Sequence, residues 1–353
     1  MIPTEETVTA EWLSEQLNRN GVNGQVISFT AQRIGTGQIG KCLRYELSYA
    51  PGTSGPASLV GKFPSDDPTS RATGVALKNF IREVRFYQEL QSLLSIRTPR
   101  CYFAEIIDEG PEFMLLLEDM APAEQGNQLA GCDAQTAEAA VLQLVGLHAP
   151  SWNANHLRDK VWLAGDPEPD PALPTTRDLY RMQLPGFMDY FGDKLADDER
   201  RIIEQVGAAD EGPLFHRDPA PFSLVHVDYR LDNLLFNPNG EVTAVDWQSI
   251  TLGAPLNDVA YFMGAGLLPE ARLGVERDIV LKYHQGLLAA GITDFSWDDC
   301  WQRYRRGTFA GFGVTVIAAN LVQHTPRGDE MFVAMARRHS RHALDLDAAE
   351  FLS

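Results

Sequence analysis

The chain has 353 residues, of which 44% are hydrophobic and 22% charged, and these are ordinary values for a folded globular protein. Its 48 acidic and 30 basic residues give a formal net charge of −18. A charge this negative repels phosphate backbones and anionic membrane surfaces, so we expect neither nucleic acid nor a membrane as a partner.

The first third of the chain predicts mostly strands. Apolar and polar side chains alternate over residues 43–49, which is typical of a half-buried strand. A short helix over residues 9–20, which Thr9 can cap, precedes the strands. The expected strands of this part are 27–34, 43–49, 57–63 and two more within 101–119.

The remainder predicts mostly helices. Apolar residues at helical spacing indicate one amphipathic helix over 77–94, which ends before Pro99. From Ala134 onward the pattern is mainly helical. One interruption has short apolar runs at 234–236 and 242–245 on either side of an Asn-Pro-Asn-Gly turn, which favours a tight hairpin.

The strongest chemical signal is HVDYRLDN at residues 226–233, followed by VDW at 245–247. Phosphoryl transfer from ATP needs a carboxylate that accepts or orients the hydroxyl proton, and oxygen ligands that hold Mg²⁺. Asp228 fits the first role, and Asn233 and Asp246 fit the second, because the hairpin would bring all three to one edge. Each alone is an ordinary turn residue, but four specified residues with flanking strands argue against chance. His226 is interpreted as a structural residue that braces the loop.

A glycine-rich turn separates the first two predicted strands. Gly35, Gly37 and Gly40 match GxGxxG, in which glycines let the backbone approach phosphates closely. A plain hairpin turn is the competing interpretation. A P-loop and a Rossmann site are disfavoured, because both must open a helix and a strand pattern follows instead. Cys42 also replaces the hydroxyl residue of a P-loop.

Lys62 ends the third predicted strand with the VxK spacing of kinases, where a lysine can reach the α- and β-phosphates. Glu83 on the amphipathic helix could pair with Lys62 and hold it extended. Glu89 is the rival partner, and a solvated surface carboxylate is the competing interpretation of Glu83.

These motifs, with LLLEDM at 115–120, LHAPSW at 147–152 and GAPLNDVA at 253–260, resemble the aminoglycoside phosphotransferase and choline kinase superfamily. The nearest resemblance is to its ecdysteroid-kinase-like branch, over about residues 35–264. Two departures are Val227, where aminoglycoside and choline kinases usually have Gly, and Arg230, at a variable loop position.

The resemblance implies an α+β, protein-kinase-like fold of two lobes. A β-rich nucleotide-binding lobe would span 1–118, a hinge 119–125, and a large, mainly helical catalytic and substrate-binding lobe 126–353. The backbone at the start of the hinge, from Glu118 to Met120, would bind the adenine. Asp258 would be a buried carboxylate that braces the catalytic loop, and His148 and Trp152 would be packing residues.

The expected function is transfer of the γ-phosphate of ATP, with Mg²⁺, to a hydroxyl of a small molecule. A protein kinase is disfavoured, because only twelve residues separate Asp246 from Asp258 and no APE motif marks a long activation segment. An aminoglycoside or choline-type kinase, and a catalytically weak nucleotide-binding scaffold, stay open as alternatives.

For the acceptor we expect a largely apolar, steroid-like alcohol ahead of an aminoglycoside. The segment 150–225 is irregular, Pro-rich and aromatic, which favours an apolar cleft. Its acidic clusters look like solvated helix ends. The candidate wall residues are Trp152, Trp162, Tyr180, Met182, Phe187, Met188, Tyr190, Phe191, Phe215 and Phe222.

We expect a cytoplasmic location. The first ten residues lack a basic region followed by an apolar run, so they do not resemble a secretory signal. The apolar stretch 309–319 is shorter than the roughly 20 residues that span a bilayer. The four cysteines form no CxxC pair, so reduced thiols are expected rather than disulfides or zinc.

Overall fold

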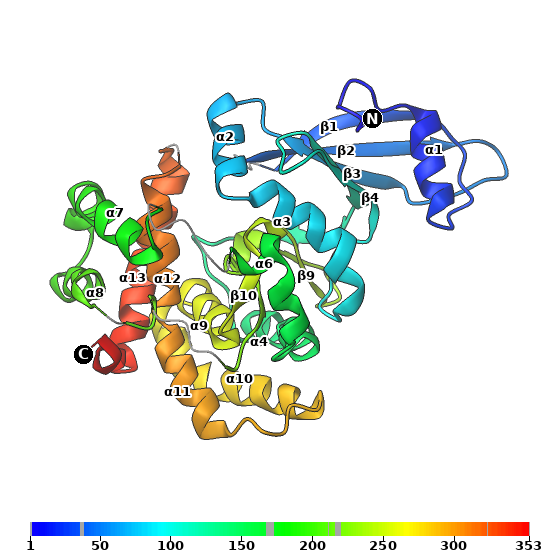
Figure 1. The fold of residues 1–353 in the computed structure, drawn as a ribbon. Helices are drawn as coiled ribbons and strands as arrows, with labels where there is room; N and C mark the ends of the chain where they lie inside the picture. The colour runs from blue at the N-terminus through cyan, green and yellow to red at the C-terminus, as the bar shows by residue number, and fades with distance from the viewer. Residues whose placement is uncertain are drawn as a thin grey trace. The chain divides into compact units, whose positions relative to one another are not determined.

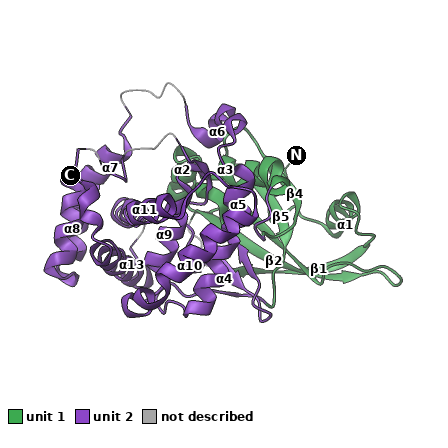
Figure 2. Ribbon diagram, turned by 90° about the horizontal axis from the view of Figure 1, so that it is seen from below, with its two compact units in different colours: residues 1–93, 98–122, 245–250 green, residues 94–97, 123–244, 251–353 purple. Residues whose placement is uncertain are grey.

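The structure is a computed structural model that describes residues 2–35, 39–166, 173–210, 212–215, 220–322 and 324–352. The chain forms two compact units (Figure 2). Unit 1 comprises residues 1–93, 98–122 and 245–250, and unit 2 comprises residues 94–97, 123–244 and 251–353. The short segment 245–250, which includes Asp246, therefore belongs to unit 1, although the residues on both sides of it belong to unit 2.

Unit 1 is built on a five-stranded antiparallel sheet with the order β1-β2-β3-β5-β4 (Figure 1). The strands predicted from alternation are therefore confirmed. In β3 the burial alternates residue by residue, so that Leu59, Gly61 and Phe63 are buried on one face of the sheet and Lys62 lies on the other. The strands are β1 (Val26–Ile34), β2 (Gly40–Tyr49), β3 (Ser58–Pro64), β4 (Cys101–Ile106) and β5 (Phe113–Glu118).

The helix predicted near the N-terminus is α1 (Ala10–Arg19), and it packs against β1. Thr9 caps it, because the Thr9 hydroxyl accepts a hydrogen bond from the backbone N–H of Trp12 at 3.1 Å. Leu13 and Leu17 of this helix are fully buried in the core that the sheet provides. This amphipathic helix thus covers one face of the sheet and leaves the face of Lys62 for other elements.

The single helix predicted over 77–94 is wrong at its start and in its regularity. An unpredicted helix, α2 (Pro68–Ala76), comes first, and the left-handed backbone of Lys78, with φ of 57°, separates it from α3 (Asn79–Arg85). A π-helical turn over Phe86–Leu90 then follows α3. Apolar spacing alone could not reveal the break, because a left-handed residue leaves the hydrophobic period on both sides intact.

Unit 2 is mostly helical and packs around α9 (Pro255–Gly266), of whose 12 residues 11 are buried. A helix that is apolar nearly all round needs neighbours on every side. Its neighbours include α4 (Ala134–Gln143), α10 (Pro269–Ala289), α11 (Trp297–Gly307) and α13 (Pro326–Asp345). Among the described residues, no helix has both the length and the apolar character needed to cross a membrane.

Two small sheets interrupt these helices. One pairs β7 (Ser223–Val225) with β10 (Thr251–Gly253), and the other has the order β6-β8-β9. The hairpin of β8 (Leu234–Phe236) and β9 (Val242–Ala244) confirms the one predicted, and Leu234 lies opposite Ala244 in its register. Asn233 directly precedes this hairpin, and Asp246 follows it by two residues. The edge strand β6 is Glu124–Gln125.

Three residues of the predicted acceptor wall belong to the core instead. Tyr180, Phe187 and Phe191 lie on α7 (Thr176–Phe191), a regular helix that continues through Pro185, and all three are fully buried in the core with residues of α8 (Asp197–Ala208) and α13. Their helical spacing places them on the apolar face of an amphipathic helix, and that face is buried in the core. Of the other candidates, Met182 and Tyr190 are exposed.

Candidate functional site

In unit 1 the predicted phosphate-binding lysine is held by two carboxylates. The Nζ atom of Lys62 donates to Oε1 of Glu83 at 2.7 Å and to Oδ1 of Asp246 at 2.8 Å. Glu83 lies on α3 and is buried, as is most of the Lys62 side chain. The rival Glu89 lies in the π-helical turn and instead pairs with Arg85 at the end of α3, at 3.3 Å.

The charges of this trio are mutually dependent. Burial alone would lower the pKa of Lys62, but the adjacent Asp246 and Glu83 carboxylates outweigh it and hold that pKa well above its ordinary value. Burial raises the pKa of Glu83, and the ion pair with Lys62 opposes this. Lys62 is therefore a permanently charged group fixed in an extended position.

Asp246 is fixed by contacts within unit 1 that the sequence analysis did not find. Its backbone is left-handed, with φ of 67°, and the next residue, Trp247, stacks on Phe86 with ring centroids 3.9 Å apart. The side-chain amide of Gln248 donates to Oδ2 of Asp246 at 3.2 Å, and Asn79 donates to the Gln248 carbonyl at 3.1 Å. The segment after β9 is thus held on α3 and on the π-helical turn that follows it.

Two of the three motif glycines can be placed, and Gly37 lies outside the described residues. Gly35 has φ of +71°, a conformation that side chains disfavour. A Cβ on Gly40 would lie 3.2 Å from Cε of Lys62, so this glycine leaves room for the lysine stem. Because Gly40 opens strand β2 rather than a helix, the structure agrees with rejecting a P-loop and a Rossmann site.

The predicted adenine-binding segment follows β5. The backbone N–H of Glu118 donates to the Arg100 carbonyl at 2.8 Å, and its carboxylate accepts from the Arg100 N–H at 3.0 Å. The next residue, Asp119, accepts from Arg44 at 2.6 Å and from Ser58 at 2.6 Å, which ties the segment to β2 and β3. The backbone of Met120 forms no hydrogen bond with any described residue, which leaves it open to a ligand.

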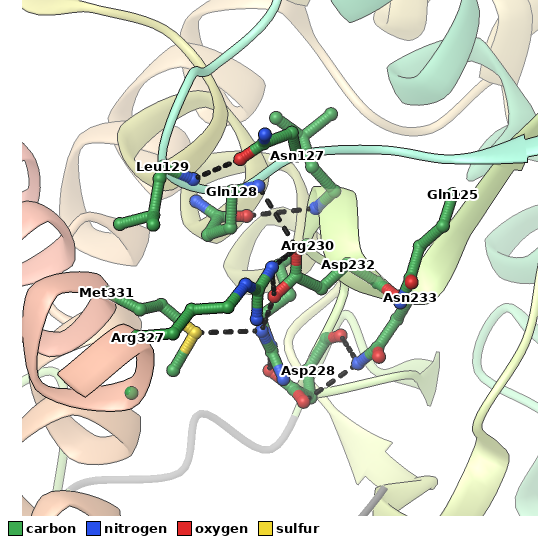
Figure 3. A network of polar contacts seen from close by, with 12 residues as sticks. Gln125, Asn127, Gln128, Leu129, Asp228, Arg230, Asp232, Asn233, Arg327 and Met331 are labelled. Atoms are coloured by element: carbon green, nitrogen blue, oxygen red, sulfur yellow. Dashed lines mark hydrogen bonds and ion pairs between the residues drawn. The ribbon is translucent and has the colours of Figure 1, made fainter. Parts of the chain in front are cut away.

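In unit 2 the predicted catalytic carboxylate, Asp228, lies in the loop between β7 and β8 (Figure 3). Its Oδ1 atom accepts from Nε of Arg230 at 2.8 Å and from the hydroxyl of Tyr261 at 2.9 Å. Its Oδ2 atom accepts from Nδ2 of Asn233 at 2.8 Å. An ionised carboxylate has about four lone-pair sites, so these three bonds leave a place for one further donor, such as a hydroxyl.

The same contacts set the ionisation of Asp228. Burial would raise its pKa, but the charge of Arg230 and the hydrogen bond from Tyr261 outweigh it, and the pKa lies below its ordinary value. Asp228 is therefore an anion at neutral pH and is ready to accept a proton. Asn233 uses its side-chain nitrogen on Asp228, which turns its carbonyl oxygen away from this contact.

Asp258 of α9 braces the loop, as the resemblance implies. Its carboxylate is buried and accepts hydrogen bonds from the backbone N–H groups of His226, at 2.7 Å, and Val227, at 2.9 Å. His148 lies 3.4 Å from the same carboxylate and 2.7 Å from the hydroxyl of Tyr283. His148 and His226 are both fully buried, which agrees with the structural roles expected of them.

A second carboxylate of the loop, Asp232, is the centre of a polar network (Figure 3). It accepts from Nη1 of Arg230 at 3.0 Å, from Nη2 of Arg327 on α13 at 3.1 Å and from the backbone of Gln128 at 3.0 Å. Gln128 also accepts from the N–H of Leu231 at 3.0 Å. Sequence analysis missed Gln128 and Arg327 because no motif includes them, whereas Arg230 and Asp232 lie inside the main motif.

Short segments of the chain are similar to larger proteins. Over 51 residues it is 55% identical to acyl-CoA dehydrogenase family member 10 of Mus musculus, a match that covers 14% of this chain and 5% of that protein. Over 42 residues it is 43% identical to acyl-CoA dehydrogenase family member 11 of Homo sapiens, covering 11% and 5%. The chain thus matches only a small part of these relatives.

Solved structures with a similar fold cover nearly the whole chain. Spectinomycin phosphotransferase, APH(9)-Ia, in complex with ADP and spectinomycin, has a TM-score of 0.51 at 13% identity, over 97% of this chain and 99% of that chain. Plasmodium vivax ethanolamine kinase has a TM-score of 0.53 at 10% identity, over 94% and 88%. These identities show the fold alone, and they confirm the kinase-like α+β architecture predicted from the sequence.

The family assignment comes from a longer match. The ecdysteroid kinase-like family matches residues 35–291, well over half of the chain, and this range includes Lys62, Asp228 and Asp246. The range starts at the glycine-rich turn and ends just after α10. The chain therefore belongs to the ecdysteroid kinase-like family.

Proposed function

We propose that this protein is an ATP- and Mg²⁺-dependent kinase that transfers the γ-phosphoryl group to a hydroxyl of a small molecule. The observation that carries the proposal is the buried lysine of β3, held at once by Glu83 and Asp246. A fixed cation of this kind serves the α- and β-phosphates of ATP, and kinases use a lysine–glutamate pair for the purpose. Membership of a kinase-like family supports the same chemistry.

Asp228 is the group that would accept the proton. As the hydroxyl oxygen of the acceptor attacks the γ-phosphorus, a new oxygen–phosphorus bond forms and the bond to the β–γ bridging oxygen breaks. The electron pair of the broken bond leaves with ADP, and the hydroxyl proton passes to Oδ2 of Asp228. The three bonds that Asp228 already accepts fix its orientation for that step.

Asn233 and Asp246 are the proposed Mg²⁺ ligands. The fit is one of donor chemistry, since Mg²⁺ prefers oxygen ligands and these residues offer a carbonyl and a carboxylate. The side-chain nitrogen of Asn233 donates to Asp228, so the side-chain oxygen of Asn233 is the atom available to an ion. The metal would neutralise charge on the phosphates, while Lys62 keeps Asp246 in place through their ion pair.

The remaining nucleotide contacts are also proposals. Gly35 and Gly40 would let backbone approach the phosphates, with Gly37 between them, and the chain after Glu118 at Met120 would contact the adenine. The open backbone groups of Met120 support this. A structural relative was solved with ADP, which supports a nucleotide as cofactor here, and ATP is the donor we propose.

For the acceptor, the aromatic wall no longer supports an apolar alcohol, because its main members are buried in the core. The charges around the proposed base support a neutral acceptor instead. Asp228 and Asp232 are both already paired with Arg230, and Asp232 also with Arg327. A polycationic aminoglycoside would have to compete with these cations, so a neutral alcohol, including an apolar one, ranks ahead of it.

The test is a screen of hydroxylated small molecules for acceptor-dependent ADP release with MgATP. Sterol-type, choline-type and kanamycin-type acceptors are compared at matched concentration, and Asp228→Asn is the matched inactive variant. Saturable ADP release that needs acceptor and Mg²⁺, and that the variant lacks, supports the kinase. Nucleotide binding without turnover on any acceptor favours a scaffold. Turnover of the kanamycin-type acceptor alone overturns the choice of acceptor and leaves the chemistry intact.

A further inference from the structure

The guanidinium of Arg230 is fixed on two sides by carboxylates of its own loop (Figure 3). Its Nε atom donates to Asp228 at 2.8 Å, and its Nη1 atom donates to Asp232 at 3.0 Å and contacts Sδ of Met331 at 3.1 Å. Its third nitrogen, Nη2, forms no hydrogen bond with any described residue. One nitrogen of an otherwise fixed cation is therefore open.

The direction of the open donor follows from guanidinium geometry. The group is a rigid planar fork, in which Nε–H and one N–H of Nη2 point from the same edge. In Arg230 the Nε–H of that edge points at Asp228. The neighbouring Nη2–H therefore points to the same side, beside the carboxylate that we propose as the base.

Arg230 is held in this orientation by a braced partner. Asp232 is 7% exposed and accepts hydrogen bonds from Arg327 and from the backbone of Gln128 as well as from Arg230. Gln128 is fully buried and donates through its side chain to the Ala265 carbonyl of α9 at 2.7 Å. The network therefore fixes the guanidinium before any ligand binds, which lowers the entropic cost of using it.

We propose that Arg230 binds the γ-phosphoryl group of ATP during its transfer, a role that rests on the proposed kinase function. The acceptor oxygen that gives its proton to Asp228 is bonded to the γ-phosphorus at the end of the reaction. A donor beside Asp228 therefore addresses an oxygen of that phosphoryl group, whereas Lys62 serves the α- and β-phosphates. The open Nη2–H donors would form charge-assisted hydrogen bonds that ADP, which lacks this group, cannot form.

The experiment compares two nucleotides in the full chain by calorimetry with Mg²⁺ present. AMP-PNP carries a γ-phosphoryl group and ADP does not, so their ratio of affinities isolates the contact without any need for the acceptor. Arg230→Gln is expected to weaken AMP-PNP binding by about tenfold or more, the range for a charged hydrogen bond, with ADP changed less than about twofold. Arg230→Lys should retain part of the preference.

Arg337→Gln is the control, because it removes a cation from α13 that donates to the Lys194 carbonyl and contacts neither Asp228 nor Asp232 among the described residues. It should leave the AMP-PNP to ADP ratio near that of the wild type. If Arg230→Gln does not fold, as judged by circular dichroism, Asp232→Asn takes its place and should reduce the ratio by loosening Arg230. An unchanged ratio, or equal losses for both nucleotides, overturns the inference. A wild type that binds neither nucleotide overturns the proposed function with it.

Discussion

The Nζ atom of Lys62 lies 2.8 Å from Oδ1 of Asp246, although 184 residues separate the two along the chain. This ion pair, with Glu83 as its third member, ties the segment after β9 to the sheet of unit 1. Because Glu83 is buried and most of the Lys62 side chain is too, removal of one member leaves the others with charge that is less well compensated. The effects of substitutions at Lys62 and Glu83 should therefore depend on each other.

We predict that Lys62→Ala lowers kcat more than it weakens ATP binding, since a fixed cation acts chiefly on charge in the transition state. Glu83→Gln should act in the same direction and less severely, because Glu83 only positions Lys62. The double variant should be little worse than Lys62→Ala, as expected for two residues that work as a unit. The measurement is kcat and KM for ATP with the acceptor from the screen.

Glu89→Gln is the control for this pair, because Glu89 follows on the same helical segment and pairs with Arg85 instead. Its kcat should stay close to that of the wild type. Fully additive losses in the Lys62 and Glu83 double variant would contradict a joint role.

Asp228→Asn is expected to lower kcat by about 10²–10⁴-fold, the usual loss on removal of a general base. ATP affinity should change little, because Asp228 is assigned to the hydroxyl and not to the nucleotide. Burial would raise the pKa of Asp228, but Arg230 and Tyr261 outweigh it and leave that pKa below its ordinary value, so wild-type kcat should not fall until the pH is well into the acid range. A kcat of the variant within about threefold of wild type would remove Asp228 from the proposed role.

The proposed metal ligands differ in how much each should matter. Asp246→Ala removes a carboxylate and with it one of the two partners of Lys62, so activity should be lost at any practical Mg²⁺ concentration. Asn233→Ala removes one neutral oxygen ligand and should be partly rescued by excess Mg²⁺. The measurement is rate against Mg²⁺ concentration for the three proteins. Activity that persists in EDTA would contradict both assignments.

The sequence predicted the parts of the site that local patterns encode. The strand position of Lys62 followed from alternation, and the hairpin between Asn233 and Asp246 followed from its turn residues. Both are set by contacts between near neighbours in the chain, which is why a single sequence reveals them.

The remaining contacts depend on tertiary packing. Arg327 reaches Asp232 from 95 residues away, and Gln128 from 104 residues away, so neither leaves a local signal. The left-handed Lys78 likewise hid the boundary between α2 and α3. The aromatic residues of α7 were predicted to form a binding wall because the sequence does not reveal that they pack against α8 and α13.

Val227 stands where aminoglycoside and choline kinases usually have glycine, and this difference leads to a prediction about the stability of the fold. Val227 has φ of 73°, a left-handed conformation that costs a β-branched residue about 1–2 kcal/mol. Val227→Gly and Val227→Ala both lose the side chain's packing, but only glycine relieves the strain. The glycine variant should therefore be the more stable of the two by about 1 kcal/mol in urea unfolding.

The same pair of substitutions at Val225 provides the control, because Val225 lies in strand β7. There alanine should be the more stable replacement, since glycine carries an entropic cost in a strand. The same order at both positions would contradict strain at Val227.

The last prediction concerns His339, which is fully buried on α13 and stacks on Tyr261 with ring centroids 5.3 Å apart. Neither ring nitrogen has a hydrogen-bond partner in the described part of the chain. Burial lowers the pKa of His339 to about 3, and the nearby His342, Arg338 and Arg272 act in the same direction.

The unfolded chain therefore binds a proton at this position below about pH 6.5, whereas the folded chain does not. The stability that the neutral ring contributes is complete above that pH and is lost as the pH falls toward 3, at about 1.4 kcal/mol per pH unit. His339→Leu should lose less free energy of unfolding between pH 7 and pH 5 than the wild type does. His156→Gln, which changes an exposed histidine, should match the wild type. Urea unfolding at pH 7, 6 and 5 measures all three, and a His339→Leu variant as acid-sensitive as the wild type would show that the folded protein protonates this ring.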